Sequence, residues 1–276
     1  MTALLPLLIE PEELAQHLDN PNVLIVDLSR PPVYSQAHVP GALHMLGQNL
    51  QLGQPPHTGK LPSNEQLSLL LQDIGYTPDK HVVAYDDEGG GWAARLLWAL
   101  EVIGHQHFSY LNGGIHSWLQ AGMPTERRIN TAEPSNYQVQ QSSGKALIEL
   151  DELLEKHADD NVVVWDARSA DEFLGVSAYA SKAGHIPGAV HYEWTRPMDM
   201  QRQLRLRDLG VLREELANLG ITSDKEVVTH CQTHHRSAFT WLVGKILGFP
   251  NIRGYAGSWA EWGNHPDTPV EKEFSE

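Results

Sequence analysis

The chain has 276 residues, of which 41% are hydrophobic and 20% charged, and its formal net charge at pH 7 is −15. This length predicts about two domains, and the composition argues against a disordered chain. An acidic surface disfavours nucleic acid and acidic membranes as partners. No apolar run approaches the length of a membrane helix. Residues 1–10 lack a basic start and are broken by Pro6, so an opening strand or loop is expected there rather than a signal peptide.

The predicted elements of the first half alternate between strands and helices. An apolar strand over residues 23–27 ends in an aspartate, and a second apolar segment begins at Val82. Apolar residues at helical spacing predict helices over residues 67–73 and 92–103. A glycine directly after the second helix is placed as its stop signal.

The second half of the chain repeats the first in the same order. The matching segments are residues 23–27 and 162–166, 38–42 and 185–189, 74–80 and 219–225, 82–83 and 227–228, and 112–118 and 256–262. Helices are expected in this half over residues 213–218 and 238–247. An ordered set of this length indicates two copies of one fold.

The two copies predict an α/β protein with two domains, each a central parallel sheet flanked by helices. Near-continuous apolar strands such as residues 162–165 are typical of a sheet buried on both faces. We expect an N-terminal domain over residues 1–126, a polar linker over residues 127–144 and a C-terminal domain over residues 145–276.

The only cysteine, Cys231, lies between an apolar strand and an apolar helical pattern. Backbone amides and the positive end of the helix dipole converge at such a turn and favour a thiolate. The alternative is an inert buried thiol. A single cysteine forms no internal disulfide, so a reducing, cytoplasmic location is expected.

The residues after Cys231 are the candidates for an anion-binding cradle. Arg236 offers a permanent planar charge, although it is also a candidate for an ion pair with Asp166 or Glu193. Of the two adjacent histidines, only one is expected to face the pocket, because neighbouring residues in a turn diverge. The predicted anion-binding residues of this loop are Gln232, Thr233, His234, His235, Arg236 and Ser237.

Three further residues are predicted to support the site. Asp166 and Arg168 follow a strand end, where ligands of open α/β sheets bind. Arg168 is expected to add to the positive field at the anion, and Asp166 to tether the loop, with structural pairing as the alternative. Trp194 is expected to exclude water from the sulfur. Trp262 is expected to pack in the core, because Trp118 repeats it in the copy without a thiol.

These motifs resemble the rhodanese domain. The resemblance rests on the strand ending in Asp166, the segment His185-Ile186-Pro187-Gly188-Ala189, the strand–Cys231–loop–helix unit and the later glycine with a tryptophan. Two copies with one cysteine resemble tandem-domain rhodaneses, and the loop Cys-Gln-Thr-His-His-Arg resembles a bacterial subset of them. The resemblance implies a thiosulfate sulfurtransferase in which a cysteine persulfide passes the outer sulfur of thiosulfate to cyanide or another thiophilic acceptor in two steps.

The first copy is expected to be non-catalytic. Alignment of the repeats places Asp86 where Cys231 stands, within Asp86-Asp87-Glu88-Gly89-Gly90-Gly91. Three carboxylates in this loop would repel an anion.

The chain departs from some relatives in ways that bear on the sulfur donor. Gln232 and Thr233 stand where vertebrate-type enzymes carry Arg-Lys. Glu172 stands where some relatives place a second arginine. The loop after Cys231 has no glycine, which argues against the branch that uses 3-mercaptopyruvate.

Three other functions remain open at this point. A rhodanese-like cysteine phosphatase would use Cys-x5-Arg, whereas four residues separate Cys231 from Arg236. A metal site is disfavoured, because neighbours such as His230 and Cys231 point apart along a strand. A persulfide carrier that delivers sulfur to a partner protein would use the same cysteine. No organic cofactor is expected, and small molecules such as thiosulfate, cyanide and thiols are the expected partners.

Overall fold

The computed structural model describes residues 4–140 and 144–272, and the chain divides into two compact units. The first unit contains the described residues of Met1–Leu50, Leu61–Ser143 and Met198–Leu206. The second unit contains those of Gln51–Lys60, Gly144–Pro197 and Arg207–Glu276. In the described part of the chain, every helix is too short or too polar to cross a membrane.

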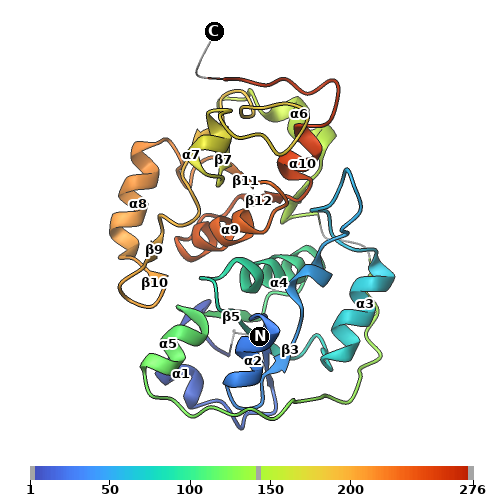
Figure 1. The fold of residues 1–276 in the computed structure, drawn as a ribbon, viewed down its shortest axis with the longest axis vertical. Coiled ribbons are helices and arrows are strands. Elements are labelled where there is room, and N and C mark those ends of the chain that lie inside the picture. The colour runs from blue at the N-terminus through green and yellow to red at the C-terminus, as the bar shows by residue number, and fades with distance from the viewer. Residues whose placement is uncertain (1–3, 141–143, 273–276) are drawn as a thin grey trace. The chain divides into compact units, whose positions relative to one another are not determined.

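The first unit is built on a five-stranded parallel sheet in the order β1-β5-β4-β2-β3. Figure 1 labels two of these strands, β3 and β5. Its strands are β1 (Leu8–Ile9), β2 (Val23–Asp27), β3 (Leu43–His44), β4 (His81–Tyr85) and β5 (Phe108–Leu111). Its helices are α1 (Pro11–Ala15), α2 (Pro31–Gln36), α3 (Asn64–Asp73), α4 (Gly91–Val102) and α5 (Gly114–Gln120), with a 3₁₀ turn η1 (Gly47–Leu50). A short antiparallel pair, β9 (Met198–Asp199) and β10 (Arg205–Leu206), belongs to the same unit.

The second unit has the same topology, with a parallel sheet in the order β6-β12-β11-β7-β8. Its strands are β6 (Leu147–Ile148), β7 (Val162–Asp166), β8 (Val190–His191), β11 (Glu226–His230) and β12 (Ile252–Tyr255). Its helices are α6 (Leu150–Lys156), α7 (Ala170–Phe173), α8 (Leu209–Asn218), α9 (Arg236–Ile246) and α10 (Ser258–Trp262). The predicted fold class and the predicted duplication are both confirmed.

The repeated histidine motif is a structural element of both units. His38 stacks on Tyr34 with ring centroids 3.8 Å apart, and its Nδ1 bonds the Tyr34 carbonyl. His185 stacks on Phe173 at the same separation, and its Nδ1 bonds the Phe173 carbonyl. Each histidine is buried, and it fixes the turn that precedes β3 in the first unit and β8 in the second.

The repeated tryptophans also occupy equivalent core positions. Trp118 and Trp262 are fully buried, and each indole N–H donates to the carbonyl of a proline, Pro124 or Pro269, at 2.8 Å. A buried indole needs such a partner for its N–H. The expectation that Trp262 belongs to the core is confirmed.

Several helices begin earlier than the apolar periodicity predicts, and polar caps extend α3 and α8 in particular. Ser63 forms a capping box with Gln66, so α3 starts at Asn64 rather than at residue 67. The carboxylate of Asp208 accepts from the Val211 amide at the start of α8. α9 starts at Arg236, two residues before the predicted start.

The domain boundaries expected from composition differ from the observed division. Residues 51–60 were placed in the first domain, but they belong to the second compact unit. Residues 198–206 were placed in the second domain, but they belong to the first unit, where the Leu206 amide donates to Asn112. Residues 127–140 also belong to the first unit. Composition cannot reveal these assignments, because they rest on contacts between segments far apart in the sequence.

Candidate active site

Cys231 follows the carboxyl end of β11 and is held by the start of α10. Its carbonyl accepts from the Trp259 amide at 2.9 Å, and the next carbonyl, of Gln232, accepts from the Ala260 amide at 3.0 Å. The Cys231 amide donates to the hydroxyl of Ser258 at 3.3 Å. These bonds fix the main chain on both sides of the sulfur atom.

The surroundings of Cys231 favour its thiolate. Burial alone would raise the pKa of this thiol, since the residue is 1% exposed. The charge of Arg236 opposes that effect, and so do hydrogen bonds from the Ser237 hydroxyl and from the amides of Ser237 and Thr233. The balance lowers the pKa of Cys231 below its ordinary value. The sulfur atom therefore lies beside main-chain donors, as an activated thiolate requires.

The loop after Cys231 turns through His234, which adopts a left-handed conformation with φ of 54°. His235 follows with φ of −90° and ψ of −63°, in the right-handed region. Alternation of left- and right-handed residues directs successive N–H groups to one side and forms an anion-binding nest. The loop thus has the backbone geometry of an anion cradle.

The two adjacent histidines have different environments. His234 is buried, and its Nδ1 lies 2.7 Å from the Ser237 hydroxyl oxygen. When that hydroxyl donates to the thiolate, its oxygen accepts from an Nδ1–H of His234. His235 is half-buried, with its ring 5.8 Å from that of Trp194. Trp194, the side chain predicted to exclude water, therefore lies beside the loop at His235.

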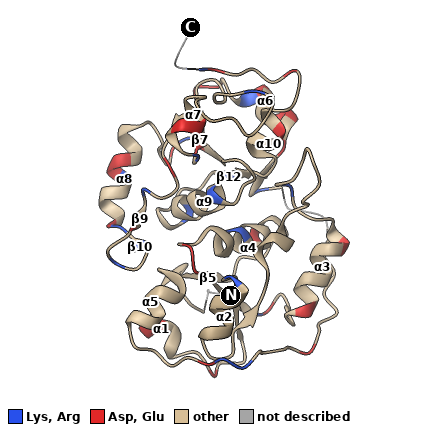
Figure 2. Ribbon diagram, viewed as in Figure 1, with Lys and Arg blue, Asp and Glu red and all other residues tan. Residues whose placement is uncertain are grey.

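Arg236 is the first residue of α9, and it pairs with Glu172 of α7. Its two terminal nitrogens contact the carboxylate at 2.6 and 2.8 Å. Figure 2 shows the acidic α7 and the basic positions of α9 in this unit. The predicted alternative, an ion pair with a carboxylate such as Asp166 or Glu193, is therefore realised with a different carboxylate, and Asp166 acts on Arg236 only through its charge. Burial would raise the pKa of Glu172, but Arg236 holds it below its usual range.

Arg168 does not have the environment expected of an anion-binding residue. It is 1% exposed, and its guanidinium contacts Asp166 at 2.6 Å and the Gly184 carbonyl at 2.8 Å. Its face lies 4.3 Å from the ring centre of Trp259. That Arg168 adds to the positive field at the anion stays a prediction, whereas its contacts match the structural alternative, because its hydrogen-bonding groups face a buried carboxylate and the main chain.

Asp166 remains ionised inside the protein. Burial would raise its pKa, but the charges of His230 and Arg168 lower it to about 2. His230 lies 3.4 Å from the carboxylate, and burial lowers the pKa of this imidazole to about 4. At neutral pH Arg168 is therefore the cation that balances Asp166.

We expect Asp166→Asn to destabilise the protein by about 3–5 kcal/mol, because it leaves the Arg168 charge buried without its partner. The counterpart in the other repeat, Asp27, is the matched control. Burial raises the pKa of Asp27, and its basic neighbour is a histidine, His44, rather than an arginine. Asp27→Asn keeps the oxygen that accepts from the Ser29 amide, so we expect a change of about 1 kcal/mol or less.

Urea unfolding of both variants measures this difference. The contribution of the Asp166–Arg168 pair is complete above the ordinary aspartate pKa and is lost as the pH falls toward about 2, because the folded-state pKa is depressed. Equal loss of stability in the two variants, or loss only in Asp27→Asn, would contradict this account.

The corresponding loop of the first unit is filled by its own carboxylate. Asp86 is fully buried, and its two oxygens accept from the amides of Glu88, Gly90 and Ala93 at 2.8–3.1 Å. Burial and the nearby Glu88 raise the pKa of Asp86 to about 6, although these amides oppose the shift. The carboxylate occupies the amides of this loop, whereas in the second unit amides face Cys231. The prediction that the first copy is non-catalytic stays a prediction, and a loop filled by its own carboxylate supports it more directly than repulsion by three carboxylates does.

Sequence reasoning missed two contributors to the site. In the sequence, Glu172 stands out only as the replacement of an arginine, and its capping box with Ser169 signals a helix start but not a partner for Arg236. Gln51, which contacts Thr233, has no local signal at all. Among residues 4–140 and 144–272, no group of three or more His, Cys, Asp or Glu side chains is placed to hold a metal ion.

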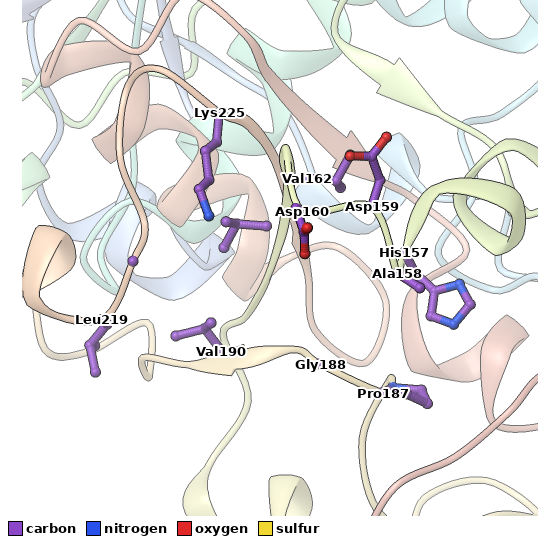
Figure 3. Close-up of a pocket in the computed structure, with 12 residues that line it drawn as sticks. His157, Ala158, Asp159, Asp160, Val162, Pro187, Gly188, Val190, Leu219 and Lys225 are labelled. Carbon is purple, nitrogen blue, oxygen red and sulfur yellow. The ribbon is translucent and has the colours of Figure 1, made fainter.

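A cavity of about 380 Å³ lies at the other edge of the second unit's sheet, beside the amino end of β7. Figure 3 shows His157, Asp159, Asp160 and Lys225 around it. None of the residues that line this cavity belongs to the predicted site. The site is therefore defined by the geometry around Cys231.

Comparison with known proteins places this geometry in context. The sequence model of the rhodanese-like domain matches residues 10–121 and 149–265. A thiosulfate sulfurtransferase of Azotobacter vinelandii is 49% identical over 271 residues, which cover 98% of each chain. A thiosulfate sulfurtransferase of Pseudomonas aeruginosa is 46% identical over 271 residues, which cover 97% of each chain.

More distant similarities extend in two directions. A sulfur carrier protein, TtuD of Thermus thermophilus, is 30% identical over 278 residues, which cover 96% of each chain. Among solved structures, an anaerobic ergothioneine biosynthesis enzyme of Chlorobium limicola aligns with a TM-score of 0.84 and 23% identity. The alignment covers 98% of this chain and 71% of that one. At this identity the likeness concerns the fold alone.

Proposed function

The chain belongs to the rhodanese family, and from this premise we propose that it is a thiosulfate sulfurtransferase that carries sulfur as a persulfide on Cys231. The observation that carries the proposal is the position of the only thiol. It is held by Thr233 and Ser237 beside the charge of Arg236, in the copy of the fold that has Cys231 where the other copy has the carboxylate of Asp86. Enzymes named thiosulfate sulfurtransferase share 46–49% of its residues over nearly the whole chain.

The first half-reaction transfers sulfur to the enzyme. The Cys231 thiolate attacks the outer sulfur of thiosulfate, a new S–S bond forms, and the S–S bond of thiosulfate breaks. Sulfite leaves with the electron pair of that bond, and the extra sulfur remains as a persulfide anion. The amides and hydroxyl around Cys231 stabilise this anion as they stabilise the thiolate.

The second half-reaction restores the thiolate. Cyanide or a thiol attacks the terminal sulfur of the persulfide, and the Cys231 sulfur leaves with the bonding electrons. Each half-reaction is a nucleophilic displacement on sulfur, and together they form a covalent, two-step catalytic cycle. The transferred atom resides on the chain itself, so the proposal includes no organic cofactor.

The length of the loop supports a sulfur donor over a phosphate ester. Four residues separate Cys231 from Arg236, one fewer than in the Cys-x5-Arg loop of cysteine phosphatases. Both terminal nitrogens of Arg236 donate hydrogen bonds to Glu172. The guanidinium therefore stabilises the thiolate through its charge, while its terminal N–H groups already bind a carboxylate. Such a site suits one sulfur atom better than a bound phosphoryl group. The lack of glycine after Cys231 supports thiosulfate over 3-mercaptopyruvate.

A second candidate function is a persulfide carrier that delivers sulfur to a partner protein. The similarity to a protein named sulfur carrier is the observation that favours it. Both functions need the same Cys231 persulfide, and they differ in the acceptor. A cytoplasmic location is part of either proposal, and it is supported by the single, unpaired cysteine.

Steady-state kinetics with thiosulfate and cyanide test the proposed function. We expect parallel lines in double-reciprocal plots, because sulfite leaves before cyanide reacts. Sulfite release that stops after one equivalent, despite excess cyanide, would support the carrier instead. Intersecting lines would contradict a covalent intermediate and with it both candidates. Heat-denatured protein is the control for direct reaction of the two substrates.

A further inference from the structure

We propose that Gln51 is a positioning residue for the loop of residues 232–237. Gln51 holds Thr233 in place, so that the amide N–H of Thr233 faces Cys231. The proposal rests on the proposed function of Cys231 and names a residue that acts through the loop rather than on the substrate. Gln51 stands 182 positions from Thr233 in the sequence, yet both belong to the second compact unit.

The direct evidence is a pair of contacts between Gln51 and Thr233. The Gln51 amide nitrogen lies 3.0 Å from the Thr233 carbonyl oxygen and 3.3 Å from its hydroxyl oxygen. Thr233 is also one of the two residues whose amides lower the pKa of Cys231. The side chain of Gln51 therefore restrains Thr233 by binding the Thr233 carbonyl, and the N–H of the same Thr233 stabilises the thiolate.

The peptide geometry explains why this restraint matters. In a trans peptide, the carbonyl of Thr233 and the N–H of His234 point in opposite directions. A carbonyl fixed by Gln51 therefore fixes the direction of the His234 N–H, away from Gln51. His234 is the residue with positive φ, where the nest of N–H groups forms. Rotation of this peptide would disturb the cradle at its most strained residue.

Residues 51–60 are themselves anchored, so that Gln51 has a fixed base; we call this segment the strap. Gly59 packs so tightly that a Cβ atom would lie 2.6 Å from the carbonyl oxygens of both Thr233 and Ala256. Real Cβ atoms do not approach so closely, so the strap requires glycine here. The strap thus touches the loop at Thr233 twice, once through a side chain and once through its backbone.

A buried carboxylate fixes the far end of the strap. Glu261 of α10 has a side chain only 4% exposed, and it lies 3.0 Å from His57 and 2.9 Å from Lys60. Lys60 also pairs with Glu149 at 3.0 Å. The same helix begins with Ser258 and Trp259, whose bonds hold Cys231. Helix α10 therefore holds both the strap and the main chain of Cys231 in place.

The reactivity of the thiol separates positioning from ordinary packing. A residue that only stabilises the fold changes the unfolding midpoint but leaves the pKa of Cys231 unchanged. A residue that orients Thr233 changes the pKa of Cys231, because it changes a hydrogen bond to the thiolate. The pH dependence of Cys231 alkylation by iodoacetamide reports this pKa directly, since only the thiolate reacts. The measurement needs no thiosulfate and no turnover.

The test compares Gln51→Ala and Gln51→Glu with the matched control Gln54→Ala in the full-length protein. Gln54 belongs to the same strap, and its side chain is exposed. We expect Gln51→Ala to raise the apparent pKa of Cys231 and to slow persulfide formation about three- to tenfold, as for loss of one or two neutral hydrogen bonds. Gln51→Glu is nearly isosteric but replaces the donor by an anion, so we expect a larger rise.

Each outcome decides the proposal. A raised pKa in both Gln51 variants and an unchanged pKa in Gln54→Ala supports it. Profiles of the Gln51 variants that coincide with wild type overturn it, and so does an equal shift in Gln54→Ala, which would indicate non-specific loosening of the strap. If Gln51→Ala does not fold, the isosteric Gln51→Glu decides. Failure of the sulfurtransferase function would appear instead as a thiol that iodoacetamide alkylates in one sample but that takes up no sulfur from thiosulfate in a separate, unalkylated sample.

Discussion

Replacement of Cys231 by serine is expected to abolish sulfur transfer and to leave the fold intact. Serine does not ionise near neutral pH and forms no persulfide, so we expect the rate to fall by roughly three orders of magnitude or more. Cys231 is the only cysteine, and no other thiol of the chain can replace it. The amides of Thr233 and Ser237 remain able to bond the serine hydroxyl, so the loop keeps its structure.

The cyanide-dependent turnover of thiosulfate measures this loss, and circular dichroism checks the fold. Cys231→Ala is the companion variant, which removes the hydroxyl and tests whether serine retains residual activity. Substantial turnover in either folded variant would remove Cys231 from the mechanism. A loss of activity accompanied by unfolding in both variants would mean that the cysteine is structural.

The second large effect is expected for Arg236→Ala. This change removes the charge that lowers the pKa of Cys231, and it leaves the buried Glu172 without its partner. We expect kcat/KM for thiosulfate to fall by about 10²–10³, as for loss of one strong donor from an oxyanion site. The apparent pKa of the thiol should rise in the same variant, because the remaining charge near it is negative.

Arg253→Ala is the matched control for Arg236→Ala. Arg253 lies in the same unit and also binds carboxylates, with contacts of 2.6 Å to Glu152 and 2.8 Å to Glu226. Its side chain is 17% exposed, against 21% for Arg236. Loss of Arg253 should therefore affect stability to a similar extent and leave the pKa of Cys231 unchanged. Equal kinetic effects of the two changes would show that Arg236 acts only through stability.

Much of the fold follows from local patterns in the sequence. Apolar runs such as Val162–Asp166 predict buried parallel strands, and the ordered repetition of segments predicts two units of one topology. The turn at Cys231 is likewise local, because a strand, a loop and a helix follow one another within a few residues. Duplication adds information, since a motif present in both copies, such as that of His38 and His185, is a fold element before it is a site.

The remaining parts of the site depend on contacts between distant segments. Glu172 and Arg236 are 64 positions apart, and Gln51 and Thr233 are 182 apart. No periodicity or spacing encodes which carboxylate reaches Arg236. The surroundings of Arg168 depend on packing in the same way: its position after a strand suggests a residue near the ligand, and only the structure shows that it contacts Asp166 and Trp259 in the interior. The types of the residues around Cys231 predict the thiolate chemistry of the site, but only the packed structure shows which residues contact Arg236 and Thr233.

The central claim is that Cys231 exists as a stabilised thiolate that carries one sulfur atom. Intact-mass measurement of the protein after thiosulfate treatment, and again after cyanide, tests it most directly. We expect a gain of one sulfur atom on wild type, its complete loss after cyanide, and no gain on Cys231→Ser. An unchanged mass after thiosulfate, or an equal gain on Cys231→Ser, would contradict the claim.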